Sequence, residues 1–119
     1  VYTLVIQAQS DLYEVRKMIH KIGFFIENEK FCMDAGKPYL VMRAVRGEEK
    51  TPYEPAEHEY GRLLPEVSDT AYRKFLLDER DKKMKLQETL NMQKTSGAGA
   101  RVEELTEEIT GLNWILNKF

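Results

Sequence analysis

The feature that most constrains the fold is an aliphatic run near the start of the sequence, residues 2–8. Within it, Leu4, Val5 and Ile6 follow one another without an intervening polar residue. An uninterrupted run of this kind predicts a strand that is covered on both faces, as in a parallel sheet flanked by helices. Because the run begins at Tyr2, we expect further chain upstream. Without it, the apolar edge of this strand would pair with a second copy, as a homo-oligomer or a strand-swapped pair.

A helix is predicted directly after this strand, over residues 11–22. Asp11 and Glu14 have the spacing of a capping box at its start. Gly23 follows its end, where a glycine commonly terminates a helix. The apolar residues between them recur every three or four positions and form one face: Leu12, Val15, Ile19 and Ile22.

Two further strands are predicted over residues 24–33 and 38–45. The turn-forming sequence DAGK, residues 34–37, separates them and predicts a β-hairpin. Residues 46–67 lose all periodicity, because glycines and prolines interrupt them and glutamates dominate their charge. We expect a surface connection whose glutamates are solvated, since they lack the ligand spacing of a calcium loop.

The C-terminal part predicts two long helices joined by a small, flexible loop at residues 95–99. The first helix begins after a cap at Ser68 or Asp69 and runs to about Lys94. The second covers about residues 100–117. A short loop between long helices makes them antiparallel, and the second helix has the apolar spacing of a coiled coil. Its predicted seam consists of Val102, Leu105, Ile109, Leu112, Leu116 and Phe119.

These elements predict an α/β fold in three parts: residues 1–46 with the strands and first helix, a connection over 47–67, and an antiparallel helical hairpin over 68–119. The net charge of −2 argues against a generally basic nucleic-acid binder and leaves local basic patches open. The single cysteine excludes an internal disulfide. No apolar run approaches the ~20 residues of a membrane-spanning helix, so we expect no membrane partner.

Two amides, Gln7 and Gln9, are the candidate substrate-binding residues. They lie where the first strand ends and the first helix begins. Ligands of open α/β sheets bind beyond the carboxyl ends of the strands, and an amide there can recognise the edge of a base. The alternative, that these side chains take part in the turn or in helix capping, is equally supported.

A basic cluster in the first long helix is the candidate RNA-binding surface. Such side chains contact phosphates. The competing interpretation is a hydrated helix face with internal ion pairs, and the sequence favours it slightly. The cluster consists of Arg80, Lys82, Lys83 and Lys85.

No other segment carries a recognisable catalytic or metal-binding pattern. The sequence has no glycine-rich phosphate loop, no CxxC and no HExxH. His20 and His58 are far apart in the sequence and lack metal-ligand spacing, which predicts a histidine on a helix surface and another in a loop. An independent small α/β enzyme is therefore disfavoured.

Five segments occur together in a recognisable order: LVIQAQ at 4–9, VRKMI at 15–19, GFFIENE at 23–29, GKPY at 36–39 and YGRLL at 60–64. With the helical hairpin that follows, this series resembles the C-terminal part of bacterial tRNA adenine N1-methyltransferases of the TrmK type, which modify an adenine in the D-loop region of tRNA. Ala8 and Gln9 stand where the family has Pro and Asn, and Arg62 replaces a proline. These departures imply a differently shaped adenine pocket.

The resemblance implies a Rossmann-like class I methyltransferase sheet. Residues 2–8 would be its fifth strand and the β-hairpin its sixth and seventh, with the last one antiparallel and inserted between the other two. It also implies S-adenosylmethionine as the cofactor of the full-length protein, tRNA as its partner and a cytoplasmic location. The cofactor loop and catalytic residues would lie upstream, so we expect no catalytic residue, cofactor binding or methyl transfer in this fragment. The alternative function is a stand-alone helical-hairpin module that binds a protein partner without RNA.

Overall fold

The computed structural model describes residues 3–93 and 97–119. Tyr2, the predicted helix end at Lys94 and the loop residues Thr95 and Ser96 lie outside the described residues. The described chain has an α/β fold, with one three-stranded sheet and five helices. The elements are β1 (Thr3–Ala8), α1 (Leu12–Lys21), β2 (Phe24–Asp34), β3 (Lys37–Arg46), α2 (Pro55–Tyr60), α3 (Leu63–Glu66), α4 (Thr70–Gln93) and α5 (Ala98–Leu116).

The sheet has the strand order β1-β3-β2, and both pairings are antiparallel. Leu4 of β1 lies opposite Ala44 of β3, and Ile26 of β2 lies opposite the same residue on the other side. The predicted insertion of the last strand between the other two is therefore confirmed. A register shift between Ile26 and Asn28 marks a bulge in β2, which increases its local twist.

β1 is not covered on both faces in the described chain, so that prediction is wrong here. Its residues alternate between exposed and half-buried, and Val5 is 71% exposed. Leu4 and Ile6 point to the other face, where they pack against the core. The physical reason is that the hydrophobic core of the described chain lies against only one face of the sheet. The run of aliphatic residues does not by itself reveal which face is covered.

The first helix has nearly its predicted bounds, but its predicted capping box is wrong. Asp11 adopts the left-handed conformation with φ 55° and makes no side-chain capping hydrogen bond. Its carbonyl oxygen instead accepts the Val15 N–H at 2.9 Å. At the other end, Gly23 has φ +86° and donates its N–H to the His20 carbonyl, as expected of a helix-terminating glycine.

The connection between the β-hairpin and α4 contains two short helices, although its sequence pattern predicted none. α2 begins at Pro55 and carries a capping box between Glu54 and Glu57. Proline is favourable in a first helical turn, because its missing N–H would have no partner there. The proline that interrupts the sequence period therefore starts a helix.

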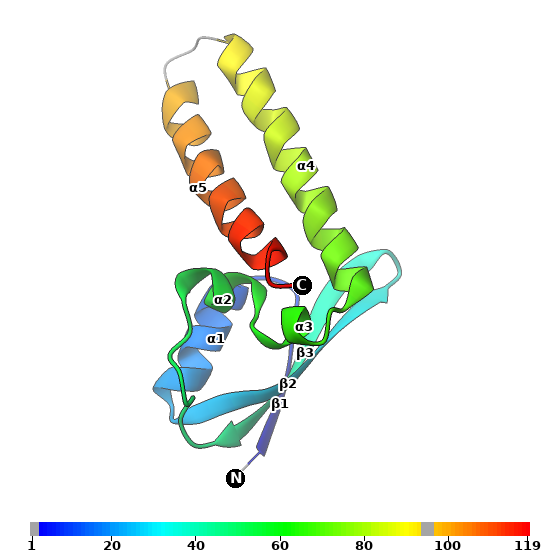
Figure 1. The fold of residues 1–119 in the computed structure, drawn as a ribbon, viewed down its shortest axis with the longest axis vertical. Helices are drawn as coiled ribbons and strands as arrows, with labels where there is room; N and C mark the ends of the chain where they lie inside the picture. Colours follow the sequence, from blue (N-terminus) through cyan, green and yellow to red (C-terminus); the bar gives the residue numbers. More distant parts are fainter. Residues whose placement is uncertain (1–2, 94–96) are drawn as a thin grey trace.

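The two long helices α4 and α5 lie side by side and extend away from the sheet (Figure 1). The predicted cap of α4 is confirmed, because the Tyr72 N–H donates to Asp69 Oδ1 at 2.8 Å. Leu105 and Leu112 of the predicted seam are fully buried. Ile115, which was not predicted to face inward, is 1% exposed.

The base of the hairpin is part of the same core as the sheet. This continuity fixes where the long helices leave the sheet, because a close-packed interior permits few alternative arrangements. The strand turn at the end of β2 lies next to the start of α4 (Figure 1). The shared core includes Ile19, Ile26, Leu40, Met42, Tyr72, Leu76, Leu112 and Ile115.

Candidate functional site

A buried ion pair between α1 and β2 organises the polar residues of this protein. Arg16 is the fourth residue after Leu12 on the inner side of α1, and its side chain is 0% exposed. Its Nε donates to Glu29 Oε1 at 2.9 Å. Burial raises the pKa of Glu29, and the adjacent Arg16 guanidinium opposes that rise. The pair therefore ties the helix to the sheet beneath it.

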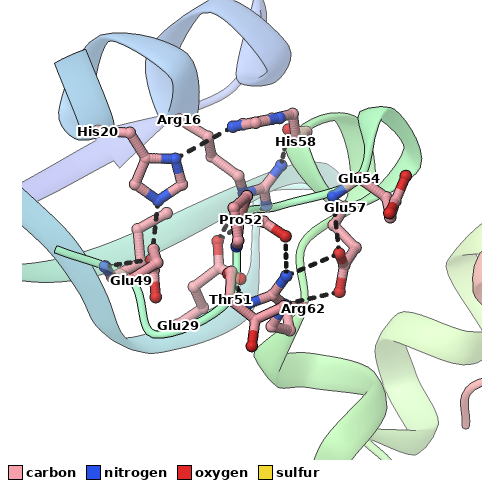
Figure 2. Close-up of polar contacts among 11 residues, drawn as sticks. Arg16, His20, Glu29, Glu49, Thr51, Pro52, Glu54, Glu57, His58 and Arg62 are labelled. Carbon is pink, nitrogen blue, oxygen red and sulfur yellow. Dashed lines mark hydrogen bonds and ion pairs between the residues drawn. The ribbon is translucent and has the colours of Figure 1, made fainter.

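The same guanidinium also holds α2 in place. Arg16 Nη1 donates to the carbonyl oxygen of His58 at 2.7 Å (Figure 2). It also donates to the carbonyl oxygen of Glu59 at 2.9 Å. These carbonyls belong to the last turn of a helix, where they lack partners within the helix. Arg16 thus supplies the donors that the end of α2 requires.

Gly61 closes this buried cluster. A Cβ atom at Gly61 would lie 2.6 Å from Glu29 Oε2 and 3.0 Å from Arg16 Nη2. Its φ of +94° is also a conformation that favours glycine. Arg16, Glu29 and Gly61 come from three separate segments of the family-like series, and they meet at one point. Those segments therefore encode a structural unit that positions α2.

His20 and His58 are neighbours in space, so the prediction of one surface and one loop histidine is wrong. His20 Nδ1 lies 3.0 Å from His58 Nε2, and His20 Nε2 lies 2.7 Å from Glu49 Oε2 (Figure 2). Burial lowers the pKa of His58, and the nearby His20, Arg16 and Lys17 lower it further. The described residues contain no group of three metal-binding side chains with suitable geometry.

The glutamates of the connection were predicted to be solvated, which is wrong for two of them. Glu49 Oε2 accepts the Ile26 N–H at 3.0 Å in addition to its contact with His20. Glu57 accepts the Arg62 Nε–H at 2.7 Å. Burial of Glu57 favours a higher pKa, but the hydrogen bonds from Arg62 and from the Glu54 N–H outweigh it and lower the pKa overall. The Glu49 contacts hold the connection against α1 and β2, and the Glu57 contacts brace the connection internally.

Arg62, one of the departures noted in the sequence, binds several groups of the connection through its guanidinium. Besides Glu57, its guanidinium donates to the carbonyl oxygens of Thr51 and Pro52, both at 2.7 Å. It also lies over the Tyr53 ring, 4.1 Å from the centroid. These hydrogen bonds hold the Thr51–Pro52 segment against the end of α2 within the connection.

A cavity of about 190 Å³ lies between the end of β1, the β2–β3 turn and the base of the long helices. Gln9 and Lys83 both line it, together with Glu59 of α2. The structure thus joins one predicted substrate-binding residue with one predicted RNA-binding residue. Gln7 is exposed on β1, opposite Val41, and is not part of the lining.

The four residues of the basic cluster differ in how free they are. Arg80 Nη1 donates to Asn113 Oδ1 at 3.0 Å, and Lys83 Nζ lies 3.1 Å from Glu108 Oε2. Lys82 is 76% exposed on its side chain, with Glu79 at 3.7 Å. Lys85 is exposed as well. The structure therefore brings Arg80 and Lys83 into contacts between the long helices and leaves Lys82 and Lys85 on the outer surface.

Comparison with known proteins places the chain in a family. The family model described as TrmK, tRNA (adenine(22)-N(1))-methyltransferase, matches residues 1–113. Comparison with curated proteins found no significant match. No helix among residues 3–93 and 97–119 is long and apolar enough to span a membrane.

Solved structures share the fold at low sequence identity. The Bacillus subtilis m1A22 tRNA methyltransferase TrmK is 18% identical with a TM-score of 0.81, and the match covers 96% of this chain and 51% of that one. A Streptococcus agalactiae protein of the NADB-Rossmann superfamily is 22% identical with a TM-score of 0.77, and the match covers 98% of this chain and 48% of that one. A Streptococcus pneumoniae protein solved in complex with S-adenosyl-L-methionine is 20% identical with a TM-score of 0.74, and the match covers 98% of this chain and 48% of that one.

The present chain thus spans about half the length of these solved chains. Their likeness supports the predicted Rossmann-like fold, and the match of the family model over residues 1–113 supports the resemblance found in the sequence. The chain belongs to the TrmK family of tRNA (adenine(22)-N(1))-methyltransferases.

Proposed function

We propose that this chain is the C-terminal part of a cytoplasmic, S-adenosylmethionine-dependent tRNA (adenine-N1)-methyltransferase, in which the helical hairpin contributes to tRNA binding. The family match over residues 1–113, together with coverage of about half of each solved relative, carries this proposal. Residues 1–46 would complete the methyltransferase sheet, and residues 68–119 would form the antiparallel coiled-coil arm. Residues 47–67 would connect the sheet to this arm.

In this proposal the cofactor binds to the other half of the protein. The connection from β1 to α1 consists of Gln9, Ser10 and Asp11, and it contains no glycine. A cofactor of this kind usually lies against a glycine-rich turn at the end of a strand, where the backbone can approach it closely. The residues present here do not fit that role, so no step of methyl transfer is assigned to them.

The proposed tRNA contacts combine the outer face of α4 with the end of β1. Lys82 and Lys85 are exposed, and Lys82 has only a long contact with Glu79 at 3.7 Å. Lys83 and Arg80 would have to exchange their present partners to bind phosphates. Gln7 and Gln9 are both exposed, which leaves their amides accessible to a base. The charges on α4 would then position the tRNA, and the amides would contact the base.

Salt-dependent binding of tRNA to the full-length protein tests this proposal. The double variant Lys82→Gln/Lys85→Gln should weaken binding and lower the slope of log Kobs against log salt by about 2. The matched control is Lys50→Gln, which removes an exposed positive charge from the connection. Equal slopes for both variants would place the tRNA elsewhere, and absence of tRNA binding by the wild-type full-length protein would eliminate the proposal.

A second candidate function is a stand-alone hairpin module that binds a protein partner without RNA. Exposed apolar side chains favour it: Met84 and Leu86 of α4 are 47% and 42% exposed, and Met92 is 83% exposed. Met-rich surfaces adapt to protein partners. Binding of a protein partner through these residues, in a full-length protein that does not bind tRNA, would support this candidate.

The edge of β1 is proposed to pair with a further strand. Within the described residues β1 pairs with β3, and no partner strand lies on its other side. An exposed edge presents unpaired N–H and C=O groups that attract another strand. We propose that the other half of the protein supplies it, or else a second copy of this chain. The molar mass of the 119-residue chain in solution, compared with that of the full-length protein, distinguishes these outcomes.

A further inference from the structure

Two histidines and a glutamate form a continuous chain of polar contacts between α1 and the connection. His20 Nε2 lies 2.7 Å from Glu49 Oε2, and His20 Nδ1 lies 3.0 Å from His58 Nε2 (Figure 2). Glu49 Oε2 also accepts the Ile26 N–H at 3.0 Å. This histidine bridge (Glu49, His20 and His58) therefore joins β2, α1 and α2.

The number of protons on the two rings decides whether the histidine bridge holds. An ionised carboxylate only accepts hydrogen bonds, so His20 Nε2 carries one proton towards Glu49. A second proton lies between His20 Nδ1 and His58 Nε2, because two bare nitrogens 3.0 Å apart would repel each other. A third proton fits on His58 Nδ1 without disturbing either bond. A fourth places N–H groups on both facing nitrogens and two positive charges side by side, which breaks the bond.

The surroundings of the rings work against this fourth proton. Burial lowers the pKa of His58, and His20, Arg16 and Lys17 lower it further, whereas Glu57 opposes them. The bridge is therefore retained near neutral pH and is lost on acidification. The charged and titratable groups around the rings are Tyr13, Glu14, Arg16, Lys17 and Lys21 of α1, Glu48, Glu49 and Tyr53 of the connection, Glu57 of α2 and, paired with Arg16, Glu29 of β2.

A second attachment between α1 and the connection provides a pivot. Apart from His20, Arg16 is the one residue of α1 whose side chain makes a hydrogen bond to the connection within residues 3–93 and 97–119, through the His58 and Glu59 carbonyls. Arg62 braces the connection internally, because it binds Glu57 and the carbonyls of residues 51 and 52. Residues 49–62 can therefore turn as one unit about Arg16 when the histidine bridge opens.

The closed arrangement also carries a cost at Tyr53. The ring of Tyr53 packs against His20 and His58, with centroids 4.6 and 5.3 Å away. Its hydroxyl is buried and has no hydrogen-bond partner among the described residues. All three residues line a cavity of about 770 Å³ between α1 and the connection. Opening this cavity to water would give the hydroxyl partners, which reduces the free-energy difference between the closed and open states.

We propose that the histidine bridge is a proton-operated switch. Uptake of the fourth proton separates His58 from His20, and residues 49–62 turn away from α1 about Arg16. The cavity widens and Tyr53 becomes accessible to solvent. Because α2 packs against both α1 and α5, the switch couples acidity to the support at the base of the hairpin. This inference goes beyond the proposed function, since it requires neither tRNA nor the cofactor.

Amide hydrogen exchange in the full-length protein tests the switch at two positions. The Ile26 N–H is bonded to Glu49 and reports on the bridge, whereas the Gly61 N–H is bonded to the Glu57 carbonyl at 2.7 Å inside the turning unit. The protection factor removes the intrinsic effect of pH on exchange. From about pH 7.5 to about pH 5 it should fall at least about tenfold at Ile26 and less than about twofold at Gly61. Loss at both amides, or at neither, would overturn the proposal.

A pair of lysine variants tests the role of charge without touching the rings. Lys17→Gln removes an exposed positive charge that opposes protonation of His58, so the Ile26 transition should move to higher pH by roughly 0.2–0.5 units. The matched control, Lys74→Gln, removes the same charge from the exposed surface of α4 and should leave the transition unchanged. Identical transitions in the two variants would contradict the proposal.

The rings themselves provide the last check. His58→Gln has no second ring to protonate, so the protection factor of Ile26 should no longer depend on pH over this range. A dependence equal to that of the wild type would overturn the switch. In the wild type, a ¹⁵N coupling across the hydrogen bond between His20 Nδ1 and His58 Nε2 should be present at about pH 7.5 and absent at about pH 5. Its absence at the higher pH would show that the rings share no proton, and the proposal would fall.

Discussion

Arg16 and Glu29 form an ion pair that is completely removed from solvent, with Nη2 and Oε1 2.8 Å apart and both side chains 0% exposed. The two residues are separated by 13 positions in the sequence, and they connect α1 to β2. Because Arg16 also binds two carbonyls of α2, one guanidinium joins three elements. A buried pair of this kind need not add net stability, but removal of one partner leaves a charge without compensation.

Breaking this pair from either side should be strongly destabilising. Arg16→Met or Glu29→Leu should each lower the free energy of unfolding by about 3–5 kcal/mol, because the remaining charge stays buried. The double variant should lose less than the sum of the two single losses, by about 0.5–3 kcal/mol. Urea unfolding of all four proteins measures this coupling. Strictly additive losses would show that the two side chains do not interact.

Gly61→Ala should be more destabilising than Gly36→Ala, although both glycines have positive φ angles, of +94° and +78°. The strain of an L residue in this region costs about 1–3 kcal/mol at either site. Only at Gly61 would the new Cβ also collide, 2.6 Å from Glu29 Oε2, whereas nothing lies within 4 Å at Gly36. The difference between the two thermal midpoints measures this collision together with the additional backbone strain at Gly61, whose ψ of 156° lies in a region that few residues other than glycine adopt. Equal midpoints would mean that the buried cluster can shift to admit a methyl group.

Stability should fall at mildly acidic pH because of His58. Its pKa is lowered in the folded protein by burial and by His20, Arg16 and Lys17, with Glu57 opposing. The unfolded chain then takes up a proton first, below about pH 6.5. The contribution of His58 to stability is therefore complete above that pH and is lost as the pH falls through its lowered folded-state value.

The measurement for His58 is the free energy of unfolding at about pH 7.5 and about pH 5.5, for the wild type and for His58→Gln. The variant should show a smaller loss between the two conditions, because glutamine does not titrate. The rings of Tyr13 and Tyr53 also contact His58, so a comparison at the higher pH corrects for lost packing. A pH dependence that is the same in both proteins would contradict the role given to His58.

Truncating the seam between the long helices should be costly only where it is buried. Leu112→Ala removes a side chain that is 0% exposed and should lower the free energy of unfolding by about 2–5 kcal/mol. Leu86→Ala is chemically the same change on α4 at a residue that is 42% exposed, and it should cost less than about 1 kcal/mol. Similar losses would indicate that the long helices do not pack as described. Denaturant unfolding with a constant m-value provides the comparison.

Sequence patterns were sufficient where the controlling physics is local. The order strand, helix, strand, strand follows from hydrophobic period and turn residues, and the glycine end of α1 at Gly23 follows from a conformation that only a few residues adopt easily. The cap of α4 by Asp69 acts over three residues. The resemblance supplied the remaining topology, including the position of β3 between β1 and β2.

Other features were decided by tertiary structure, because they depend on residues that are distant in the sequence. His20 and His58 lie 38 positions apart, and Arg16 reaches a carbonyl 42 positions away. No local periodicity in the sequence indicates such partners. The glutamates of the connection were therefore predicted to be solvated, although Glu49 and Glu57 make hydrogen bonds within the protein.

The sequence by itself determined the types and order of the main elements of this protein, since propensity, capping and turn chemistry act within a few residues of one another. Only the tertiary structure decided that Gln9 and Lys83 share a cavity while Gln7 stays outside it, and that β1 is half-covered. Those outcomes depend on which face of each element the chain packs together. That choice is made by long-range burial and by the buried Arg16–Glu29 pair, and no short segment encodes it.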